Sequence, residues 1–354
     1  MSDLLDFLTE PPNINRAHDW LAEVTMDRYP SSLLSSLSSN FALRQNMRVF
    51  KDEDGAAVLV TGKDEGEEAV LELAGVLVEH SLPPIVSREQ VPREKPYLAT
   101  QSVTLTGLGH GQFTHAATAV QNIHTLFSTR YRNLVPYTSD TFRSFPALTF
   151  DNRYVTPLKK GRGETNLPFG REVDPKGILR TMLDRRGIHT EDNRVLYFEG
   201  IRGKRRGEWG FESMNPDAFA AGQIVQLQVA FTVVPCPTGG NYQMVGKLRS
   251  IALMISTLRD DFLFRPRVTE PKTPPALKVC GIKRRIGYAA HPVRETEERR
   301  DEDMRSAREA FEDTEGRGAT PPPPTPAGED EMDSTDEEDK RDNEERRKRP
   351  CHGV

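Results

Sequence analysis

Cysteine is scarce in this sequence of 354 residues, with only Cys236, Cys280 and Cys351 present and no Cys-x-x-Cys pair. An odd number of thiols without paired spacing argues against a disulfide framework and against a zinc finger. No run of about 18 apolar residues occurs, so no membrane-spanning helix is expected. The first residues, MSDLLDFLTEPPN, lack the basic start and apolar run of a signal peptide. These absences predict a soluble intracellular protein that does not associate with a membrane.

Motifs for catalysis and cofactor binding are also missing. No nucleophile elbow, HExxH, EF-hand loop or kinase motif is found. TGLGHGQFTH (106–115) lacks the third glycine position of a dinucleotide fingerprint, and no Walker lysine follows it. GNYQMVGK (240–247) has one residue too many for a phosphate loop and is typical of a strand. We therefore expect a tight turn at 106–111, no cofactor, and no support for an enzyme.

Histidines in the glycine-rich segment and just after it raise the question of a metal site. His110, His115 and His124 are five and nine residues apart, whereas two imidazoles on one helical face need a spacing of four. His115 and His124 should point to opposite sides of a helix. We expect no bound metal, and the role of these three histidines stays open.

Charge is distributed unevenly, although the formal net charge is only −5. Residues 1–150 carry a net of −6, residues 151–290 a net of +10, and residues 291–354 a net of −9. Because the charge of a surface region governs which partners it attracts, the basic middle indicates an anionic partner. The acidic ends are equally able to recruit basic protein partners.

Composition divides the chain into five parts. We expect a helical N-terminal segment (1–50), a small α/β or linker region (51–94), a β-rich core (95–265), a basic linker (266–290) and a charged, largely disordered tail (291–354). Within the second part, EEAVLELAGVLVEH has apolar residues too dense to distinguish a strand from a helix. The predicted fold class is α+β, with the core an antiparallel sandwich or an OB-like barrel.

A long β-hairpin is the strongest local prediction. In GQIVQLQVAFTVVP (222–235), apolar residues alternate with polar ones over nine positions, which a helix would not produce. CPTGGN supplies a turn, and NYQMVGKLRSIALMI (241–255) returns as a second strand with Lys247 and Arg249 on its polar side.

Two helices are predicted from capping and period. One begins near Phe113 with Thr114 as its cap, and the other is DPKGILRTMLDRRG (174–187), capped by Asp174 and ended by Gly187.

Cations gather in segments that we expect to be loops or strand faces of the core. Glycine next to cations is suited to following a phosphate backbone, and Tyr197, Phe198, Trp209, Phe211 and Tyr242 lie near enough in sequence to stack on bases. The candidate nucleic-acid-binding residues are Arg202, Lys204, Arg205, Arg206, Lys247, Arg249, Lys159 and Lys160. The alternative interpretation is that these charged loops only keep a β-rich domain in solution.

The tail carries two short motifs. Arg346, Arg347, Lys348 and Arg349 have the density of a nuclear localisation signal, which favours the nucleus over the cytoplasm. Ser334 and Thr335 precede acidic residues, as acidophilic kinase sites do, and phosphorylation there would add negative charge.

The segments LTGLGHGQFTHAATAVQNIHTLFSTRYRNLVPY, FRSFPALTFDNRYVTP, EDNRVLYFEG and the long hairpin together resemble a multicopy group of fungal proteins of unassigned function. The resemblance covers roughly 95–260, implies a single domain there and a fungal source, and implies no activity. The hairpin alone is similar to the end of the OB barrel in phage-type single-strand DNA-binding proteins, which implies base stacking along a basic groove.

Two functions of different kinds follow from these patterns. The first is a non-enzymatic nuclear protein whose basic β-rich core contacts single-stranded DNA or RNA. The second is a protein-interaction or self-associating scaffold, in which the acidic and basic tail, or an exposed strand edge of the hairpin, contacts protein partners.

Overall fold

The computed structural model of this chain describes residues 2–26, 28–51, 56–62, 67–158, 163–183, 186–236 and 239–265. They belong to one compact unit, Met1–Pro271. The predicted basic linker (266–290) and the predicted tail lie outside the described residues.

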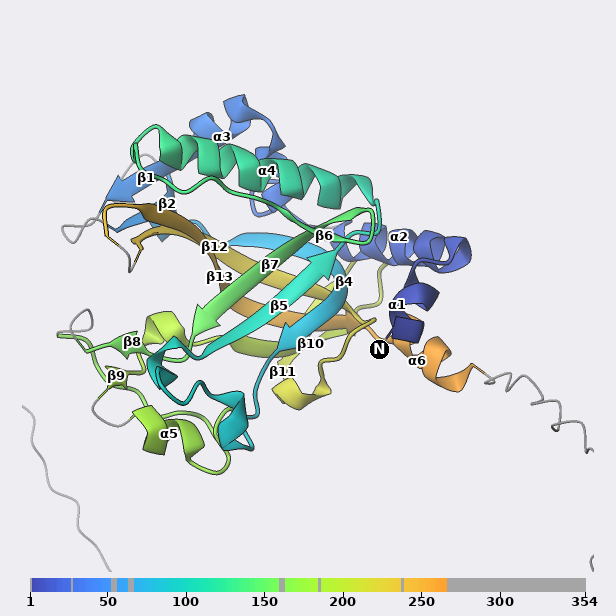
Figure 1. Cartoon of the computed structure of the whole chain (residues 1–354). Helices are drawn as coiled ribbons and strands as arrows, with labels where there is room; N and C mark the ends of the chain where they lie inside the picture. Colours follow the sequence, from blue (N-terminus) through green and yellow to red (C-terminus); the bar gives the residue numbers. More distant parts are fainter. Residues whose placement is uncertain are drawn as a thin grey trace, which may run out of the picture. The chain divides into compact units, whose positions relative to one another are not determined.

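Five strands close into a barrel (Figure 1). The ring of pairings runs from β12 to β4, β5, β7 and β13 and returns to β12. These strands are β4 (Leu71–Ser81), β5 (Thr100–Thr106), β7 (Phe145–Arg153), β12 (Ile224–Pro235) and β13 (Tyr242–Ile255). The predicted α+β fold with a β-rich core is confirmed, and of its two alternatives the barrel is the one formed.

The hairpin of β12 and β13 follows the predicted alternation. Val225, Leu227 and Val229 are fully buried in the barrel, opposite Leu248 and Ile251. The register shifts between the pairs Gln228–Ser250 and Val229–Leu248, so Arg249 is an extra residue in β13. Such a bulge keeps the apolar side chains inside on both sides of it.

Strand β4 is the segment for which the sequence could not distinguish strand from helix. Leu73 and Leu77 face the barrel core, whereas Ala74 and Val76 pack beneath Leu21 of helix α2 (Pro11–Thr25). A strand covered on both faces needs no polar alternation, so periodicity could not identify it.

The sheet continues past the barrel on both sides. Strand β10 runs parallel to β13 and pairs with β11, and β2 joins β12 and carries β1 and β3. A separate pair, β8 and β9, lies apart from this sheet. The bounds are β1 (Met47–Lys51), β2 (Ala57–Thr61), β3 (Glu67–Glu68), β6 (Asp140–Phe142), β8 (Thr156–Pro157), β9 (Gly187–Ile188), β10 (Leu196–Arg202) and β11 (Trp209–Ser213).

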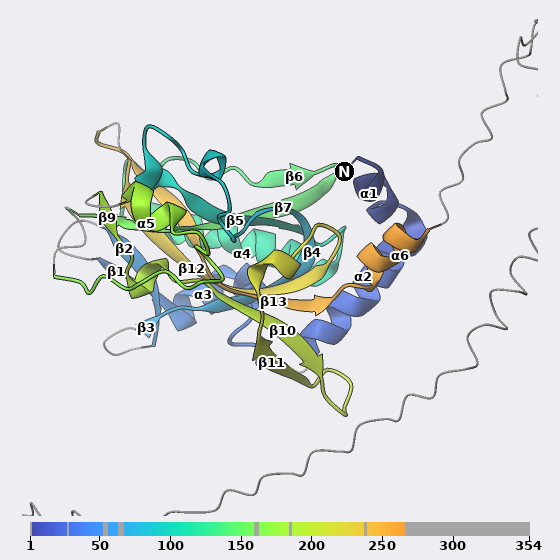
Figure 2. The same ribbon diagram turned by 90° about the horizontal axis from the view of Figure 1, so that it is seen from below.

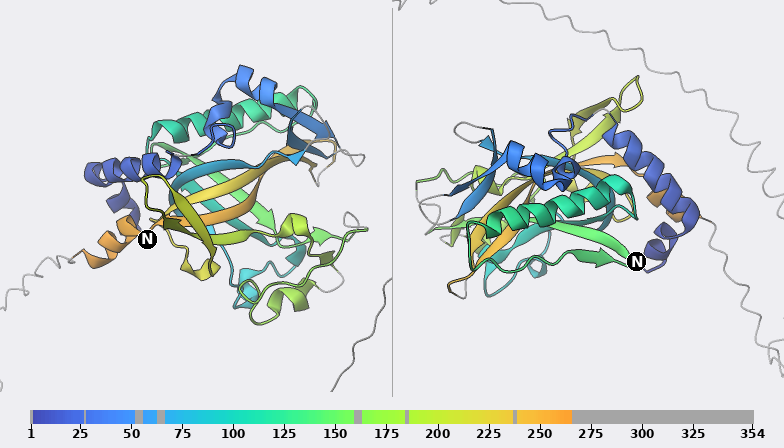
Figure 3. Two further views of the ribbon diagram at one scale, coloured as in Figure 1. Left: turned by 180° about the vertical axis from the view of Figure 1, so that it is seen from behind. Right: turned by 90° about the horizontal axis from the view of Figure 1, so that it is seen from above.

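Helices cover the barrel on two sides. Helix α4 lies along one side, and α2 lies beside α1 and α6 at one end (Figure 3). The helical N-terminal segment is confirmed, and Pro11 and Pro12, which end the first helix, also form the first turn of the second. The remaining bounds are α1 (Ser2–Leu8), α3 (Asn40–Asn46), α4 (Gly111–Ser128), α5 (Ile178–Leu183), α6 (Thr257–Phe264), η1 (Leu34–Ser38), η2 (Arg88–Gln90), η3 (Pro96–Leu98), η4 (Glu191–Asn193) and η5 (Pro216–Ala218).

Two helix predictions need correction, one in its cap and the other in its length. Helix α4 begins at Gly111, before Thr114, whose hydroxyl donates to the His110 carbonyl at 3.2 Å instead of accepting from an amide. The helix predicted over 174–187 is only the short α5. Asp174 nevertheless accepts from the backbone N–H groups of Ile178 and Arg180, at 2.7 and 3.0 Å.

The glycine-rich segment before α4 is a tight turn, as expected. A Cβ at Gly107 would lie 2.2 Å from the Cβ of Phe113, and Gly109 has φ +90°. Close packing and a left-handed backbone explain both glycines without a phosphate.

Candidate nucleic-acid interface

A groove of about 250 Å³ runs over the outer face of the sheet. Residues of β10 and β11 line one side of it, and Figure 2 shows this two-stranded ribbon standing away from the barrel near α2. Its lining joins a loop residue to the side chains of five strands: Arg28, Glu72, Leu196, Phe198, Phe211, Gln226, Gln228, Ser250 and Ala252.

Strand register places these side chains on one face. Gln228 pairs with Ser250, which pairs on its other side with Leu196 of β10. Phe198 lies two residues beyond Leu196 and Gln226 two before Gln228, so each points to the same side as its neighbour. The barrel core requires the intervening residues to point inward, which leaves these facing out.

Arg28 covers the aromatic side of the groove. Its guanidinium carbon lies 5.1 Å from the Phe211 ring centroid, and its Nη2 donates to Gln226 Oε1 at 2.7 Å. Its Nε lies 3.8 Å from Glu72 Oε2 and, although buried, has no hydrogen-bond partner among the described residues. The Phe211 ring itself is 41% exposed and stands in a T-shaped contact with Phe198.

The tip of the β10–β11 ribbon carries the cluster predicted at 202–206. Arg202 is held in place, because it lies 2.7 Å from Glu23 and stacks over Trp20 and Trp209 at 5.1 and 5.5 Å. Arg206 lies 3.9 Å from the same carboxylate. Lys204 and Arg205 are exposed in the turn, and neither forms an ion pair with the residues that the structure describes.

The two faces of this ribbon differ in charge. Arg202, Trp209 and Phe211 share the face toward the groove, whereas Glu199 and Glu212 stand directly opposite each other on the far face. An anion approaching the ribbon is therefore attracted on the groove side and repelled on the other.

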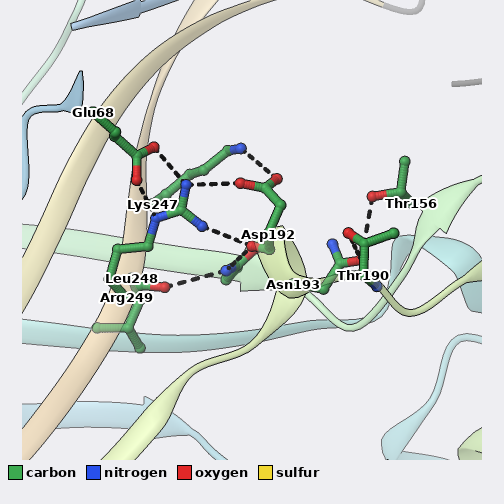
Figure 4. Close-up of polar contacts among 9 residues, drawn as sticks. Glu68, Thr156, Thr190, Asp192, Asn193, Lys247, Leu248 and Arg249 are labelled. Atoms are coloured by element: carbon green, nitrogen blue, oxygen red, sulfur yellow. Dashed lines mark hydrogen bonds and ion pairs between the residues drawn. The ribbon is translucent and has the colours of Figure 1, made fainter. Parts of the chain in front are cut away.

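Lys247 and Arg249 lie on the same outer face but are engaged in an ion-pair cluster (Figure 4). Arg249 donates from Nε to Glu68 at 2.9 Å and from Nη2 to both Glu68 and Asp192, and its Nη1 donates to the Asp192 carbonyl at 2.7 Å. Lys247 Nζ lies 2.6 Å from Asp192 Oδ2. Both charges are balanced, and they attach the turn η4 to the barrel wall.

Electrostatics in this cluster favour the charged forms. Burial by itself would raise the pKa of Asp192, but Lys247 and Arg249 outweigh it and lower that pKa below its ordinary value. Burial likewise disfavours the Arg249 cation, yet hydrogen bonds and charge from Glu68 and Asp192 raise its pKa.

The predicted cations thus share a face without forming one patch. Arg202 lies three residues beyond Glu199, and Glu199 pairs with Leu253 of β13. At about 3.3 Å per residue, this register places Arg202 about 30 Å along the strands from Lys247. Carboxylates of Glu23, Glu68 and Asp192 lie at the two clusters. Lys159 and Lys160 lie outside the described residues, as do Ser334, Thr335 and the four basic residues at 346–349.

Two of the aromatic residues suggested for stacking face inward. Tyr197 is buried against the core, and the Tyr242 ring packs 4.6 Å from that of Tyr131. No sequence pattern indicated that Arg28 belongs to this site, because its position above Phe211 depends on strands almost two hundred residues away.

Two of the three histidines near the glycine-rich turn have described partners. The His110 ring lies 5.4 Å from that of His18, and His124 Nε2 lies 2.9 Å from the Val135 carbonyl. Burial, with a smaller effect of His18, lowers the pKa of His110. Within the described part of the chain, no three His, Cys, Asp or Glu side chains are grouped as metal ligands, and no helix is long and apolar enough to span a membrane.

Comparison with known proteins adds little to this picture. No family model and no curated protein matches the chain. Among solved structures, it is similar to gp2.5, a single-stranded DNA-binding protein encoded by bacteriophage T7, with a TM-score of 0.31 and 9% identity over 53% of this chain and 92% of that one. A TM-score this low establishes neither a shared fold nor a shared function. The fungal resemblance of 95–260 stays a prediction.

Proposed function

We propose that this protein binds single-stranded DNA or RNA in the groove between the loop after α2 and the β10–β11 ribbon. The observation that carries the proposal is the exposed Phe211 ring under Arg28, beside a turn whose Lys204 and Arg205 have no described ionic partner. Aromatic rings and cations side by side are the means by which proteins hold unpaired strands.

Stacking supplies the first part of the interaction. Every base has a π-face, so an exposed ring accepts bases without regard to sequence, at about 1–3 kcal/mol per base. A duplex hides its base faces, so this groove is expected to select single strands.

Hydrogen-bonding groups along the groove floor supply the second part. Ser250 donates to Gln228 Oε1 at 2.9 Å, so the Gln228 amide N–H groups can donate to another partner. Gln228 is exposed, whereas Gln226 is held by Arg28 and Glu72. Gln228 is therefore the floor residue best suited to contact a base edge.

Phosphate contacts supply the third part, from the ribbon turn. Lys204, Arg205 and Arg206 reach solvent there, whereas Lys247 and Arg249 are neutralised and leave little charge to offer. Three phosphate contacts give a salt slope of about −2 for a single strand, a modest dependence. We expect moderate affinity that weakens as salt rises.

The test is fluorescence anisotropy with the full chain, labelled oligo-dT and oligo-U, and salt from low to physiological. Binding of the single strands with a falling affinity, and weaker binding of the same sequence as a duplex, is the expected result. No anisotropy change at low salt, or a preference for duplex, would remove the proposal.

A protein-interaction role has one observation in its favour. Strand β11 ends the strand order of the described sheet, so its outer edge could receive a strand of a partner. The β12–β13 hairpin offers no comparable edge, because β4 and β2 pair with β12 and β10 and β7 pair with β13. Strand addition depends on backbone hydrogen bonds, so partner capture that is insensitive to salt would favour this role.

Two further proposals rest on the sequence alone. We propose that the basic cluster at 346–349 directs the protein to the nucleus and that Ser334 and Thr335 are phosphorylated. Microscopy of the full chain with the four basic residues changed to alanine, and phosphopeptide mapping of 330–345, test them.

A further inference from the structure

A second and larger cleft, of about 680 Å³, lies at one end of the barrel. One wall comes from β5 and β10, and the other from the irregular segment 167–173 that precedes α5. Its buried polar lining includes Gln101, Tyr154, His189 and Tyr197, its exposed polar residues include Ser213 and Asn215, and its apolar lining includes Pro168 and Met214. This volume is within the range typical of small-molecule sites.

The wall of the cleft includes a buried polar group that the fold itself does not satisfy. Tyr154 is 2% exposed, and its hydroxyl has no hydrogen-bond partner among the described residues. The neighbouring Tyr197 hydroxyl, by contrast, donates to Gln101 Oε1. A buried hydroxyl without a partner costs free energy, so it is rarely retained in a core that could use phenylalanine.

The buried hydrogen-bonding side chains of the cleft are neutral. Burial raises the pKa of both Tyr154 and Tyr197, so both phenols keep their protons at neutral pH. His189 Nδ1 lies 2.7 Å from the Tyr154 carbonyl, which assigns the proton to Nδ1 and leaves Nε2 as an acceptor. Burial, the largest effect, lowers the pKa of His189 and keeps the ring uncharged.

Charged groups stand only at the rim. Glu172 is exposed, and Arg194 is held by Glu191 at 3.0 Å. An ion placed in the interior would lose its hydration without a counter-charge, whereas an uncharged ligand with donors and acceptors would be satisfied. The His189 ring, already packed 4.4 Å from that of Phe169, adds a planar aromatic wall.

We propose that this cleft binds a nucleobase, with Tyr154 and His189 contacting its hydrogen-bonding edge. An uncharged heterocycle with a planar face and an edge of donors and acceptors matches this lining. The base could come from a free nucleoside or from a bound strand, since Leu196 lines both the cleft and the groove. Only the second source rests on the proposed strand binding.

The test titrates uridine and adenosine into the full chain by NMR and compares three variants. Tyr154→Phe removes only the hydroxyl and should weaken nucleoside binding about tenfold. Met214→Trp puts a larger side chain in the cleft and should weaken nucleoside binding. Tyr137→Phe, on the α4 side of the barrel, is the matched control and should bind as the parent does.

A second arm separates the two sources of the base. An oligonucleotide with one abasic position should bind more weakly than the intact strand, and Tyr154→Phe should erase that difference, if the base belongs to the strand. Equal affinity of the abasic and intact strands, together with nucleoside binding, assigns the site to free nucleosides. Failure of strand binding alone would remove the groove proposal and leave this one standing.

Stability gives an independent readout. Because the Tyr154 hydroxyl has no partner in the unliganded fold, Tyr154→Phe should melt at the same temperature as the parent or higher. Nucleosides that do not bind, equal nucleoside binding by Tyr154→Phe and the parent, or a lower melting temperature for that variant would each overturn the proposal.

Discussion

Two groups of cations extend from one sheet, each with a lysine and an arginine, and the two groups differ in how their charge is neutralised. Arg249 and Lys247 in β13 are enclosed by Glu68 and Asp192, and Arg249 is only 16% exposed. Lys204 and Arg205 in the ribbon turn have no such partners among the described residues. Sequence position shows where a positive charge is, whereas the neighbours brought in by folding decide whether that charge is available to a ligand.

The largest expected difference between the two groups is in stability. Arg249→Met leaves Glu68 and part of Asp192 without a counter-charge, so the free energy of unfolding should fall by about 3 kcal/mol. Lys204→Met removes the same charge from an exposed turn and should change it by less than about 0.5 kcal/mol. Urea denaturation of both variants measures this. Equal losses would show that the cluster does not stabilise the fold.

The next effect concerns the ring between the two groups. Phe211→Ala removes the exposed stacking surface and should weaken oligo-dT binding about tenfold, within the 1–3 kcal/mol expected for one base. Phe41→Ala removes another highly exposed phenylalanine, on α3, and should leave affinity unchanged. Anisotropy titrations compare them. Equal affinities for the two variants would place the strand elsewhere.

A smaller effect concerns phosphate contacts at the turn. The double change Lys204→Gln and Arg205→Gln should make the salt slope of strand binding shallower by about 1.4, since each phosphate contact contributes about 0.7. Arg130→Gln with Arg132→Gln, beyond the end of α4, removes the same charge and should leave the slope as it is. If both pairs flatten the slope equally, only net charge matters and the turn has no special role.

The smallest effect is on the pH dependence of stability. The pKa of Asp192 is lowered in the folded protein. Its contribution to the free energy of unfolding is therefore complete above the ordinary aspartate pKa of about 3.9 and is lost as the pH falls through the lowered pKa. Asp192→Asn should therefore flatten the loss of stability on acidification below about pH 4. The effect is small because the side chain is 43% exposed and solvent screens it. Asp217→Asn, on η5, is the control, and an unchanged acid profile for Asp192→Asn would contradict the assignment.

Local patterns in the sequence predicted the parts of the fold whose signals are local. The alternation of 224–233 gave the correct strand and the correct inward face, because one side of that strand is polar. Strand β4 was ambiguous because α2 covers the face that would otherwise have been polar. The length of the helix over 174–187 was overestimated. Asp174 does cap it by accepting from the Ile178 N–H, but the helix itself spans only Ile178–Leu183.

The candidate site was predictable only in its outline. The cations at 202–206 stand at a strand end and its turn, within the loops and strand faces that were expected, but Glu68, which neutralises Arg249, is 181 residues away in sequence. No local pattern indicates such a partner. Arg28 above Phe211 and the unsatisfied hydroxyl of Tyr154 likewise exist only once distant strands are assembled.

Photocrosslinking of a 5-iodouracil oligonucleotide to the full chain, with the crosslinked peptides mapped by mass spectrometry, tests the groove most directly. The strand-binding account predicts crosslinks within β10 and β11, at Phe198 and above all at Phe211, and their loss when unlabelled single strand competes. Crosslinks that map to the Lys247 and Arg249 cluster or to the α4 side of the barrel, with none in β10 or β11, would contradict it.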